Sequence, residues 1–209
     1  YRVIGLRRGW AGLVDMVPDK DADNSINFQA LDEDDEVNRA ARTGGTFVAD
    51  TQAMRKAPLD RPVLGLFSPS HMTYQLDRKP DTSEPTLTEM TAEALRRLSD
   101  DPSGYYLMVE GGRIDHGHHA GKAGYALEET IEFARAIQYA VDNTDPDETL
   151  ILVTADHSHV FTIAGYPKRG NPILGLVHPP ASGDEDHPGA ANDAAGIAGD
   201  GQPYSTLGY

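Results

Sequence analysis

The sequence contains no cysteine, which excludes disulfide bonds and thiolate metal sites. It also has no apolar run near the roughly 18 residues that a membrane helix needs, so we expect no membrane span. Basic residues are scarce: 18 Lys and Arg stand against 33 Asp and Glu, giving a net charge of −15. A surface of this sign argues against nucleic acid as a partner.

The length and composition suit a globular α/β chain of about one domain. There are 209 residues, and a hydrophobic content of 39% is enough for a core. The chain opens with "YRVIGLRRGW", without Met or a signal-peptide pattern, so we expect this start to lie inside a longer gene product. The acidic runs "DEDDE" and "GDEDHPG" are typical of solvated loops.

Several short segments have strand or helix patterns. Strands are predicted for "YRVIGL", "TFVAD" and "PVLGLF", and a short helix for residues 34–42. Thr86 and Glu89 have the spacing of a capping box at the start of a helix. Residues 179–203, rich in Gly, Ala, Pro and Asp, are expected to form a loop or a disordered stretch.

The middle of the chain has the pattern of a strand–helix–strand unit. Apolar runs at Tyr105–Val109 and Thr149–Thr154 are typical of buried strands, and a helical repeat occupies about residues 120–143 between them. Strands joined by such a crossover lie parallel. We therefore predict an α/β fold with a mostly parallel central sheet flanked by helices.

Side chains that bind metals follow both of these predicted strands. "EGGRIDHGHH" begins at Glu110, and "ADHSH" begins at Ala155. The carboxyl ends of parallel strands are where ligands bind in open α/β sheets. Asp115 and His119 are four residues apart, so in a helix they would lie on one face and share a cation such as zinc.

The remaining polar residues of the two stretches suggest further ligands. Asp156 and His157 could share a second metal at an irregular turn, and Glu110 offers an oxygen suited to magnesium. The other histidines, which would bind substrate phosphate or hold metal ligands in place, are His116, His118 and His159. Two neighbouring metals suit phosphoryl chemistry. The alternative is that these residues are ordinary caps and loop residues.

Roughly residues 45–209 resemble alkaline phosphatase. The resemblance rests on "VEGGRIDHGHHAGKA", "ETLILVTADHSHVFTIAGYPKRGNPILGL" and "PYSTLGY". It implies a periplasmic or secreted, homodimeric hydrolase of phosphate monoesters with two zinc ions and one magnesium ion. By motif, it implies that Asp115 and His119 bind the first zinc, Asp156 and His157 the second, and Glu110 the magnesium.

The sequence also departs from that family. The family nucleophile is a Ser in an Asp-Ser-Ala motif, and this motif does not occur here. The first zinc normally gains another His from a His-x-Gly-Glu-Asp motif, which is also absent. Animal relatives bind calcium near the "GLF" stretch, but Ser68 replaces an expected acid, which leaves the Phe67 carbonyl and Glu84. The calcium site is therefore expected to be incomplete.

The first 47 residues resemble a segment of phosphofructokinase instead. "YRVIGLRRGWAGLVDMVPDKDADNS" and "RTGGTF" carry this resemblance, which predicts a boundary between residues 1–47 and a partial alkaline phosphatase domain at 48–209. The Gly-rich nucleotide loop of the kinases is missing, so no kinase activity is expected. Two hypotheses remain for the chain: an incomplete, weakly active or inactive phosphatase, and a non-catalytic module that binds zinc or magnesium.

Overall fold

The computed structural model describes residues 2–7, 44–180 and 194–209, which fall into two compact units. Unit 1 comprises Tyr1–Arg113 and Glu128–Leu152, and unit 2 comprises Ile114–Leu127 and Val153–Tyr209. The predicted helix at 34–42 and most of the predicted loop at 179–203 lie outside the described residues.

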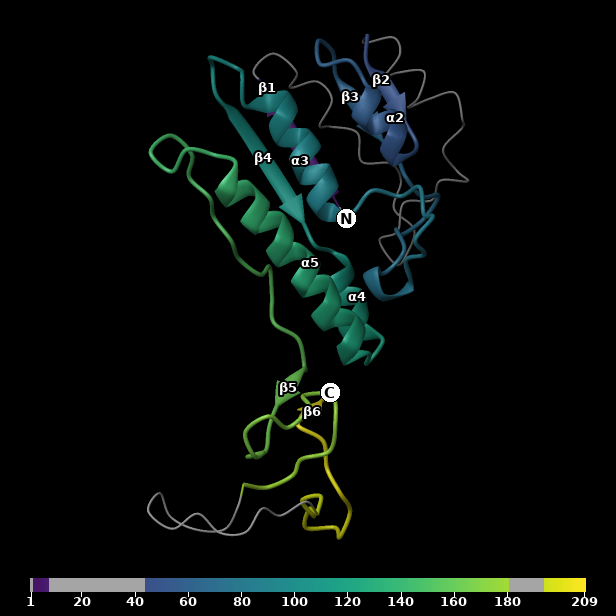
Figure 1. Cartoon of the computed structure of the whole chain (residues 1–209), viewed down its shortest axis with the longest axis vertical. Coiled ribbons are helices and arrows are strands. Elements are labelled where there is room, and N and C mark those ends of the chain that lie inside the picture. The colour runs from purple at the N-terminus through teal and green to yellow at the C-terminus, as the bar shows by residue number, and fades with distance from the viewer. Residues whose placement is uncertain (1, 8–43, 181–193) are drawn as a thin grey trace. The chain divides into compact units, whose positions relative to one another are not determined.

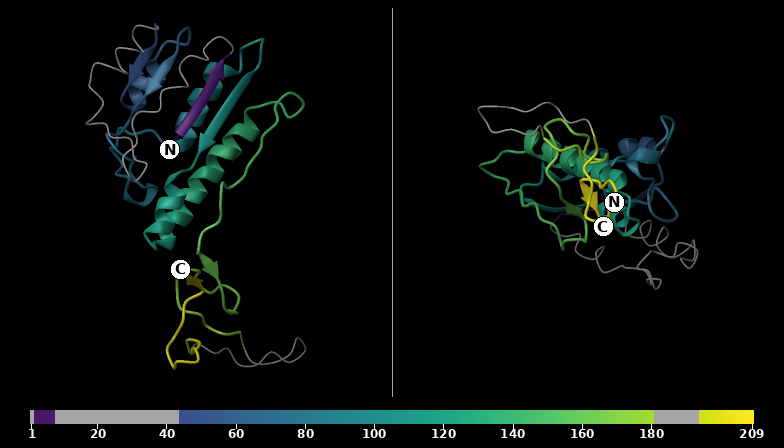
Figure 2. Two further views of the ribbon diagram at one scale, coloured as in Figure 1. Left: turned by 180° about the vertical axis from the view of Figure 1, so that it is seen from behind. Right: turned by 90° about the horizontal axis from the view of Figure 1, so that it is seen from below.

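The strands of unit 1 form two pairs. β1 (Arg2–Arg7) is antiparallel to β4 (Tyr105–Glu110), with Arg2 opposite Glu110 and Arg7 opposite Tyr105. β2 (Thr46–Val48) is parallel to β3 (Val63–Gly65). Figures 1 and 2 show β1 and β4 side by side, with α3 (Leu87–Leu98) packed against them. Four of the five predicted strands and the α/β class are confirmed, but among the described strands the parallel pairing is confined to β2 and β3.

The helices of unit 1 begin where the sequence supplies caps. Asp50 caps α2 (Thr51–Lys56) by accepting a hydrogen bond from the Ala53 amide at 2.7 Å. The predicted capping box of α3 is confirmed, since Thr86 and Glu89 each accept a hydrogen bond from the other's backbone N–H. A short 3₁₀ turn, η2 (Gln75–Asp77), precedes α3.

The core of unit 1 is apolar, with carboxylates at its margin. Its central cluster contains Val48, Met54, Ala57, Met72, Leu87, Met90 and Ala136. Two buried acids come from α5 (Ala123–Asp142), and both cap other elements. Glu129 accepts from the Gln75 amide of η2 at 2.7 Å, and Glu132 accepts from the Thr88 amide of α3 at 2.9 Å. These bonds satisfy amides that a helix start leaves without a backbone acceptor.

Unit 2 has less regular structure. It contains α4 (Arg113–His119) from Ile114 onward, the first turn of α5, and the antiparallel pair β5 (Thr162–Ile163) and β6 (Leu207–Gly208). Gly117 of α4 lies against Ala126 of α5: a Cβ at this glycine would be 2.7 Å from the Ala126 amide nitrogen. Only a residue without a side chain fits this contact.

One prediction is wrong: the segment Thr149–Thr154 is not a strand, so the parallel strand–helix–strand unit does not form. A strand exists only where its backbone pairs with a neighbour, and no described segment pairs with this one. β4 pairs with β1 instead, in the antiparallel sense. Leu150 and Leu152, which gave the segment its buried-strand pattern, are each 82% exposed.

Candidate metal centre

The helix α4 brings Asp115 and His119 together on one face. The predicted helical turn is present, and His119 Nε2 lies 3.4 Å from Asp115 Oδ2. The acidic side chain lies in the first turn of α4 and the histidine in its last, which is the favourable order for a helix dipole. A carboxylate oxygen and an imidazole nitrogen are both ligands that zinc accepts.

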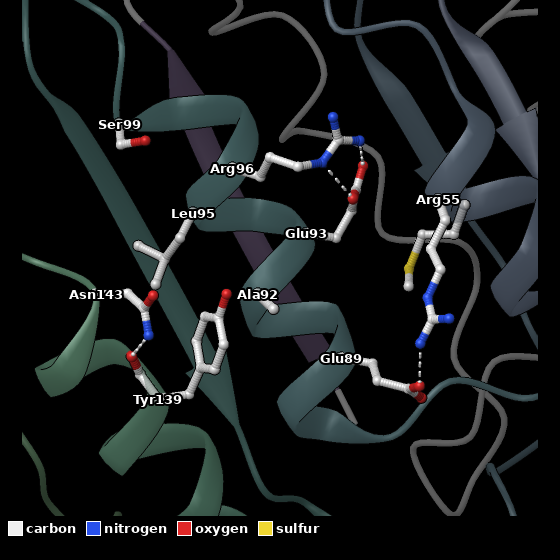
Figure 3. Close-up of a pocket in the computed structure, with 10 residues that line it drawn as sticks. Arg55, Glu89, Ala92, Glu93, Leu95, Arg96, Ser99, Tyr139 and Asn143 are labelled. Carbon is white, nitrogen blue, oxygen red and sulfur yellow. Dashed lines mark hydrogen bonds and ion pairs between the residues drawn. The ribbon is translucent and has the colours of Figure 1, made fainter.

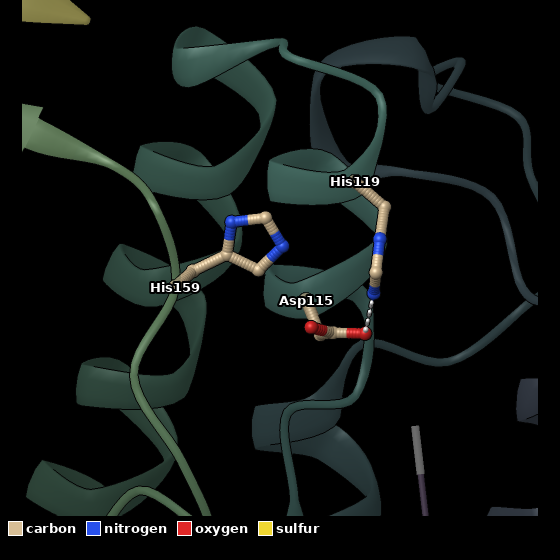
Figure 4. Close-up of side chains that lie close together, drawn as sticks. All are labelled: Asp115, His119 and His159. Carbon is tan, nitrogen blue, oxygen red and sulfur yellow. Dashed lines mark ion pairs between the residues drawn. The ribbon is translucent and has the colours of Figure 1, made fainter. Parts of the chain in front are cut away.

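A third side chain reaches this pair from a distant part of the sequence. His159 lies in the loop before β5, and Figure 4 shows its ring directed toward Asp115 and His119 on α4. Each of the three offers one ligand atom, and these atoms all lie within 4.8 Å of one another. Atoms that share a tetrahedral zinc at about 2.0–2.2 Å lie about 3.4 Å apart. The three atoms would therefore have to move closer together to share one ion.

The environment of His159 also fits a metal ligand. Its Nδ1 atom is buried and has no hydrogen-bond partner among the described residues. A buried polar nitrogen without a partner is costly, and a bound cation would remove that cost. The three residues are the one group of this kind that the described ranges contain.

An aromatic cluster surrounds the His159 ring. His118 stacks on it with ring centroids 5.2 Å apart and an interplanar angle of 19°, while His119 meets it edge-on at 4.9 Å. Phe161 lies 5.1 Å from the His118 ring, and the Tyr209 hydroxyl shares a 3.1 Å hydrogen bond with His118 Nδ1. We call His118, Phe161 and Tyr209 the aromatic support. It restricts how the His159 ring can turn.

The pKa values of two histidines shift in opposite directions. Burial, followed by the neighbouring His159, lowers the pKa of His118, which favours the neutral ring in this stack. The pKa of exposed His157 is raised, first by its 2.9 Å hydrogen bond with the Ser158 carbonyl and then by Asp156. His157 Nε2 lies 3.5 Å from Asp156 Oδ2. Asp156 and His157 therefore form a separate, solvated pair.

Comparisons with known proteins identify the family. The profile described as Alkaline phosphatase matches residues 12–189. The chain belongs to the alkaline phosphatase family. The match begins within the segment that resembles phosphofructokinase, and the boundary near residue 47 stays a prediction.

Curated alkaline phosphatases are similar over part of the chain. The tissue-nonspecific isozyme of Gallus gallus is 56% identical over 124 residues, covering 59% of this chain and 23% of the relative. The Homo sapiens isozyme is 53% identical over 115 residues, covering 55% and 22%. The chain thus spans about a quarter of these relatives or less. The Thermus thermophilus alkaline phosphatase structure aligns with a TM-score of 0.49 at 28% identity, covering 56% of this chain and 25% of that one.

The other predicted site residues of this alkaline phosphatase chain lie outside the three-residue group. Glu110 is exposed at the end of β4, in unit 1, whereas the group belongs to unit 2. His116 is half-buried on α4. Sequence reasoning had assigned His159 to substrate or support, and it missed Phe161 and Tyr209. No local pattern signals these contacts, because His118 and Tyr209 are 91 positions apart.

Glu84, one of the two residues that remained for a calcium site, is engaged within the protein. Both oxygens of the Glu84 carboxylate accept hydrogen bonds from Thr73: Oε2 from the amide at 2.9 Å and Oε1 from the hydroxyl at 3.3 Å. Arg78 lies 3.7 Å from the same carboxylate. With a cation already beside it, Glu84 is a poor site for a second one.

Unit 1 also contains a groove of about 430 Å³, shown in Figure 3. Its charged side chains are matched: Arg55 pairs with Glu89 at 2.6 Å, and Arg96 pairs with Glu93 at 2.7 Å. Since these charges neutralise each other, the groove selects neither an anion nor a cation. No helix in the described part of the chain combines the length and apolarity needed to cross a bilayer.

Proposed function

We propose that this chain supplies metal ligands for hydrolysis of phosphate monoesters of the alkaline phosphatase type. The observation that carries the proposal is the convergence of Asp115, His119 and His159, whose ligand atoms lie within 4.8 Å of one another. Membership of the family, through the match to residues 12–189, supports the reaction class.

In this proposal Asp115 and His119 hold one zinc ion, and Asp156 with His157 holds a second. Glu110 binds magnesium, while His116 and His118 contact phosphate or orient the ligands. Zinc, when bound, supplies a Lewis acid that stabilises charge on phosphate-ester oxygens. Protons compete with zinc for carboxylate and imidazole ligands, so we expect zinc binding to weaken as the pH falls.

The reaction also needs a nucleophile, and the sequence has no Asp-Ser-Ala motif. We therefore expect this chain by itself to be weakly active or inactive. The second hypothesis, a non-catalytic module that binds zinc or magnesium, is supported by the same two facts: ligands are present and the nucleophile motif is not. From the resemblance we also infer a periplasmic or secreted location, a homodimer, and a partial phosphatase domain over residues 48–209.

Hydrolysis of p-nitrophenyl phosphate separates these two functions. The purified chain is assayed at alkaline pH with zinc and magnesium, with and without EDTA. Asp115→Asn and Asp156→Ala are compared with Asp147→Asn, an exposed acid in the loop after α5. Turnover abolished by EDTA and by both site variants, but kept by Asp147→Asn, supports catalysis by this chain. Zinc binding without turnover supports the binding module, and the absence of both contradicts the proposal.

A further inference from the structure

We propose that Arg113 is a positioning residue for the Asp115–His119 pair and acts through its contact with the ring of Tyr74. This inference rests on the proposed function, in which Asp115 and His119 hold a zinc ion, and it adds a contact that keeps their helix formed. Arg113 is the first residue of α4, and both Arg113 and Tyr74 belong to unit 1. The contact therefore lies within one unit, at the start of the helix that carries the two ligands.

The short helix α4 needs support from outside its own sequence. It has 7 residues, and isolated helices of fewer than about 12–15 residues are marginal in water. Gly111 and Gly112 join it to β4, and glycine leaves such a connection free to adopt many conformations. Asp115 and His119 lie one turn apart only while α4 is helical, so a contact that stabilises the helix also sets the separation of the two ligand atoms.

Arg113 makes a contact of this kind. Its guanidinium carbon lies 3.5 Å from the centre of the Tyr74 ring, and both side chains are half-buried. The negative face of an aromatic ring attracts a cation, and the attraction shifts an equilibrium by about 30-fold when both groups are shielded from water. Burial is the main cause that lowers the pKa of the guanidinium, while Tyr74, Asp77 and Glu84 act against this shift.

The helix itself does not favour a cation at this position. A helix start carries partial positive charge, so a positive side chain in the first turn is unfavourable there. An attraction from outside the helix must offset this cost for Arg113, and the Tyr74 ring supplies one.

The backbone around Tyr74 is fixed on both sides. The amide of the preceding residue, Thr73, donates to Glu84 at 2.9 Å. The amide of the following residue, Gln75, donates to buried Glu129 at 2.7 Å. A residue whose backbone is already fixed loses less conformational entropy when its side chain forms a contact. Tyr74 therefore offers a prepared ring face to the start of α4.

The test compares the zinc affinity of the full chain with the helix content of α4. Competition with a chromophoric chelator measures the affinity, and the Cα chemical shifts of residues 114–119 report the helical fraction without metal. Arg113→Met removes the charge and Tyr74→Leu removes the ring, and we expect each to weaken zinc binding by about 10-fold. Because only the helical form presents both ligands on one face, the helical fraction should fall by a similar factor.

Two further variants test whether the two side chains act as a pair. The double variant Arg113→Met/Tyr74→Leu should bind zinc no more weakly than either single variant, because each single change already removes the shared contact. Tyr74→Phe keeps an aromatic face for the cation and should retain an affinity within about 2-fold of wild type.

Two controls separate this contact from general effects. Lys122→Met removes a different cation from a tyrosine ring, that of Tyr125 at 4.9 Å, and should leave the zinc affinity unchanged. Leu87→Ala removes a core side chain of unit 1 and should lower the stability without changing the zinc affinity.

The outcomes distinguish failure of this inference from failure of the proposed function. If the ligand variants Asp115→Asn and His119→Ala abolish zinc binding while both single variants bind as tightly as wild type, the positioning role is wrong and the zinc pair stands. If the ligand variants also bind as tightly as wild type, the proposed function fails. Losses that add in the double variant would show that Arg113 and Tyr74 do not act together. In the unsubstituted chain the Tyr74 ring must shift the side-chain proton signals of Arg113 upfield, and unshifted signals would overturn the inference without any variant.

Discussion

The two units differ in what can stabilise them. Most of the buried apolar side chains belong to unit 1, including Val48, Met54, Leu87, Met90 and Leu98, whereas Ala126 and Val177 represent this class in unit 2. Both units expose large apolar side chains, among them Leu150 and Leu152 in unit 1 and Val160, Ile163 and Tyr166 in unit 2. A small unit with so little buried apolar area needs another source of stability, and metal binding is a common one.

This contrast explains why the candidate ligands lie where they do. Unit 1 uses two of its buried acids, Glu129 and Glu132, as caps for other elements, and in each one carboxylate oxygen accepts from a backbone amide. Unit 2 concentrates its acid and histidines around α4 and the loop before β5, with His159 Nδ1 unsatisfied among the described residues. The same chemical groups thus serve folding in one unit and remain available to a ligand in the other.

The largest effect is expected from a cavity in unit 1. Leu87→Ala removes a side chain that is fully buried in the central cluster, and such changes cost about 2–5 kcal/mol. Chemical denaturation should show this loss, while zinc affinity stays at its wild-type value because the ligands belong to unit 2. Leu59→Ala, at a residue 47% exposed, is the control and should change stability by about 0.5 kcal/mol or less. If Leu87→Ala weakened zinc binding as well as lowering the stability, the two units would not be independent.

Zinc removal should have the complementary effect on unit 2. A ligand at 100 times its Kd stabilises the protein that binds it by about 2.7 kcal/mol. Hydrogen exchange with saturating zinc should therefore slow in α4 and around His159, and EDTA should reverse the effect. The core strands β2 and β3 of unit 1 serve as the internal control. Protection that rises equally in both units would contradict a site confined to unit 2.

A smaller effect is expected at the contact between α4 and α5. In Gly117→Ala the new Cβ would lie 2.7 Å from a backbone nitrogen of Ala126, which cannot rotate away. Overpacking costs about 1–3 kcal/mol, and alanine recovers about 0.5–1 kcal/mol through helix propensity. We expect a net loss of up to about 2.5 kcal/mol, seen as faster hydrogen exchange in α4 and weaker zinc binding. Gly199→Ala, which faces open space, should change neither.

The success of prediction from the sequence also differs between the two units. In unit 1 the signals are local: the capping box at Thr86 and the apolar run at Tyr105 each specify an element by themselves. Pairing partners are not local, so β4 was expected to have a parallel neighbour at Thr149–Thr154 and pairs with β1 instead. In the metal centre the Asp115–His119 spacing was informative because a helix turn fixes it. The contributions of His159 and Tyr209 depend on loop closure, which spacing does not encode.

The smallest effect concerns the pH dependence of unit 1. Burial is the main cause that raises the pKa of Glu129 above its ordinary 4.5, and Glu132 adds to it. The folded state therefore keeps this proton after the unfolded chain has lost it. The stabilising contribution is complete below pH 4.5 and is lost as the pH rises through the folded pKa.

Glu129→Gln removes the titrating group and retains an oxygen that can accept from the Gln75 amide. Its free energy of unfolding should therefore fall less than that of wild type between pH 4.5 and neutral pH, whatever its absolute stability. Denaturant midpoints across this range measure the difference, with Glu148→Gln, an exposed acid in the loop after α5, as the matched control. A wild-type slope in Glu129→Gln would mean that burial does not raise the pKa of Glu129 in the folded protein.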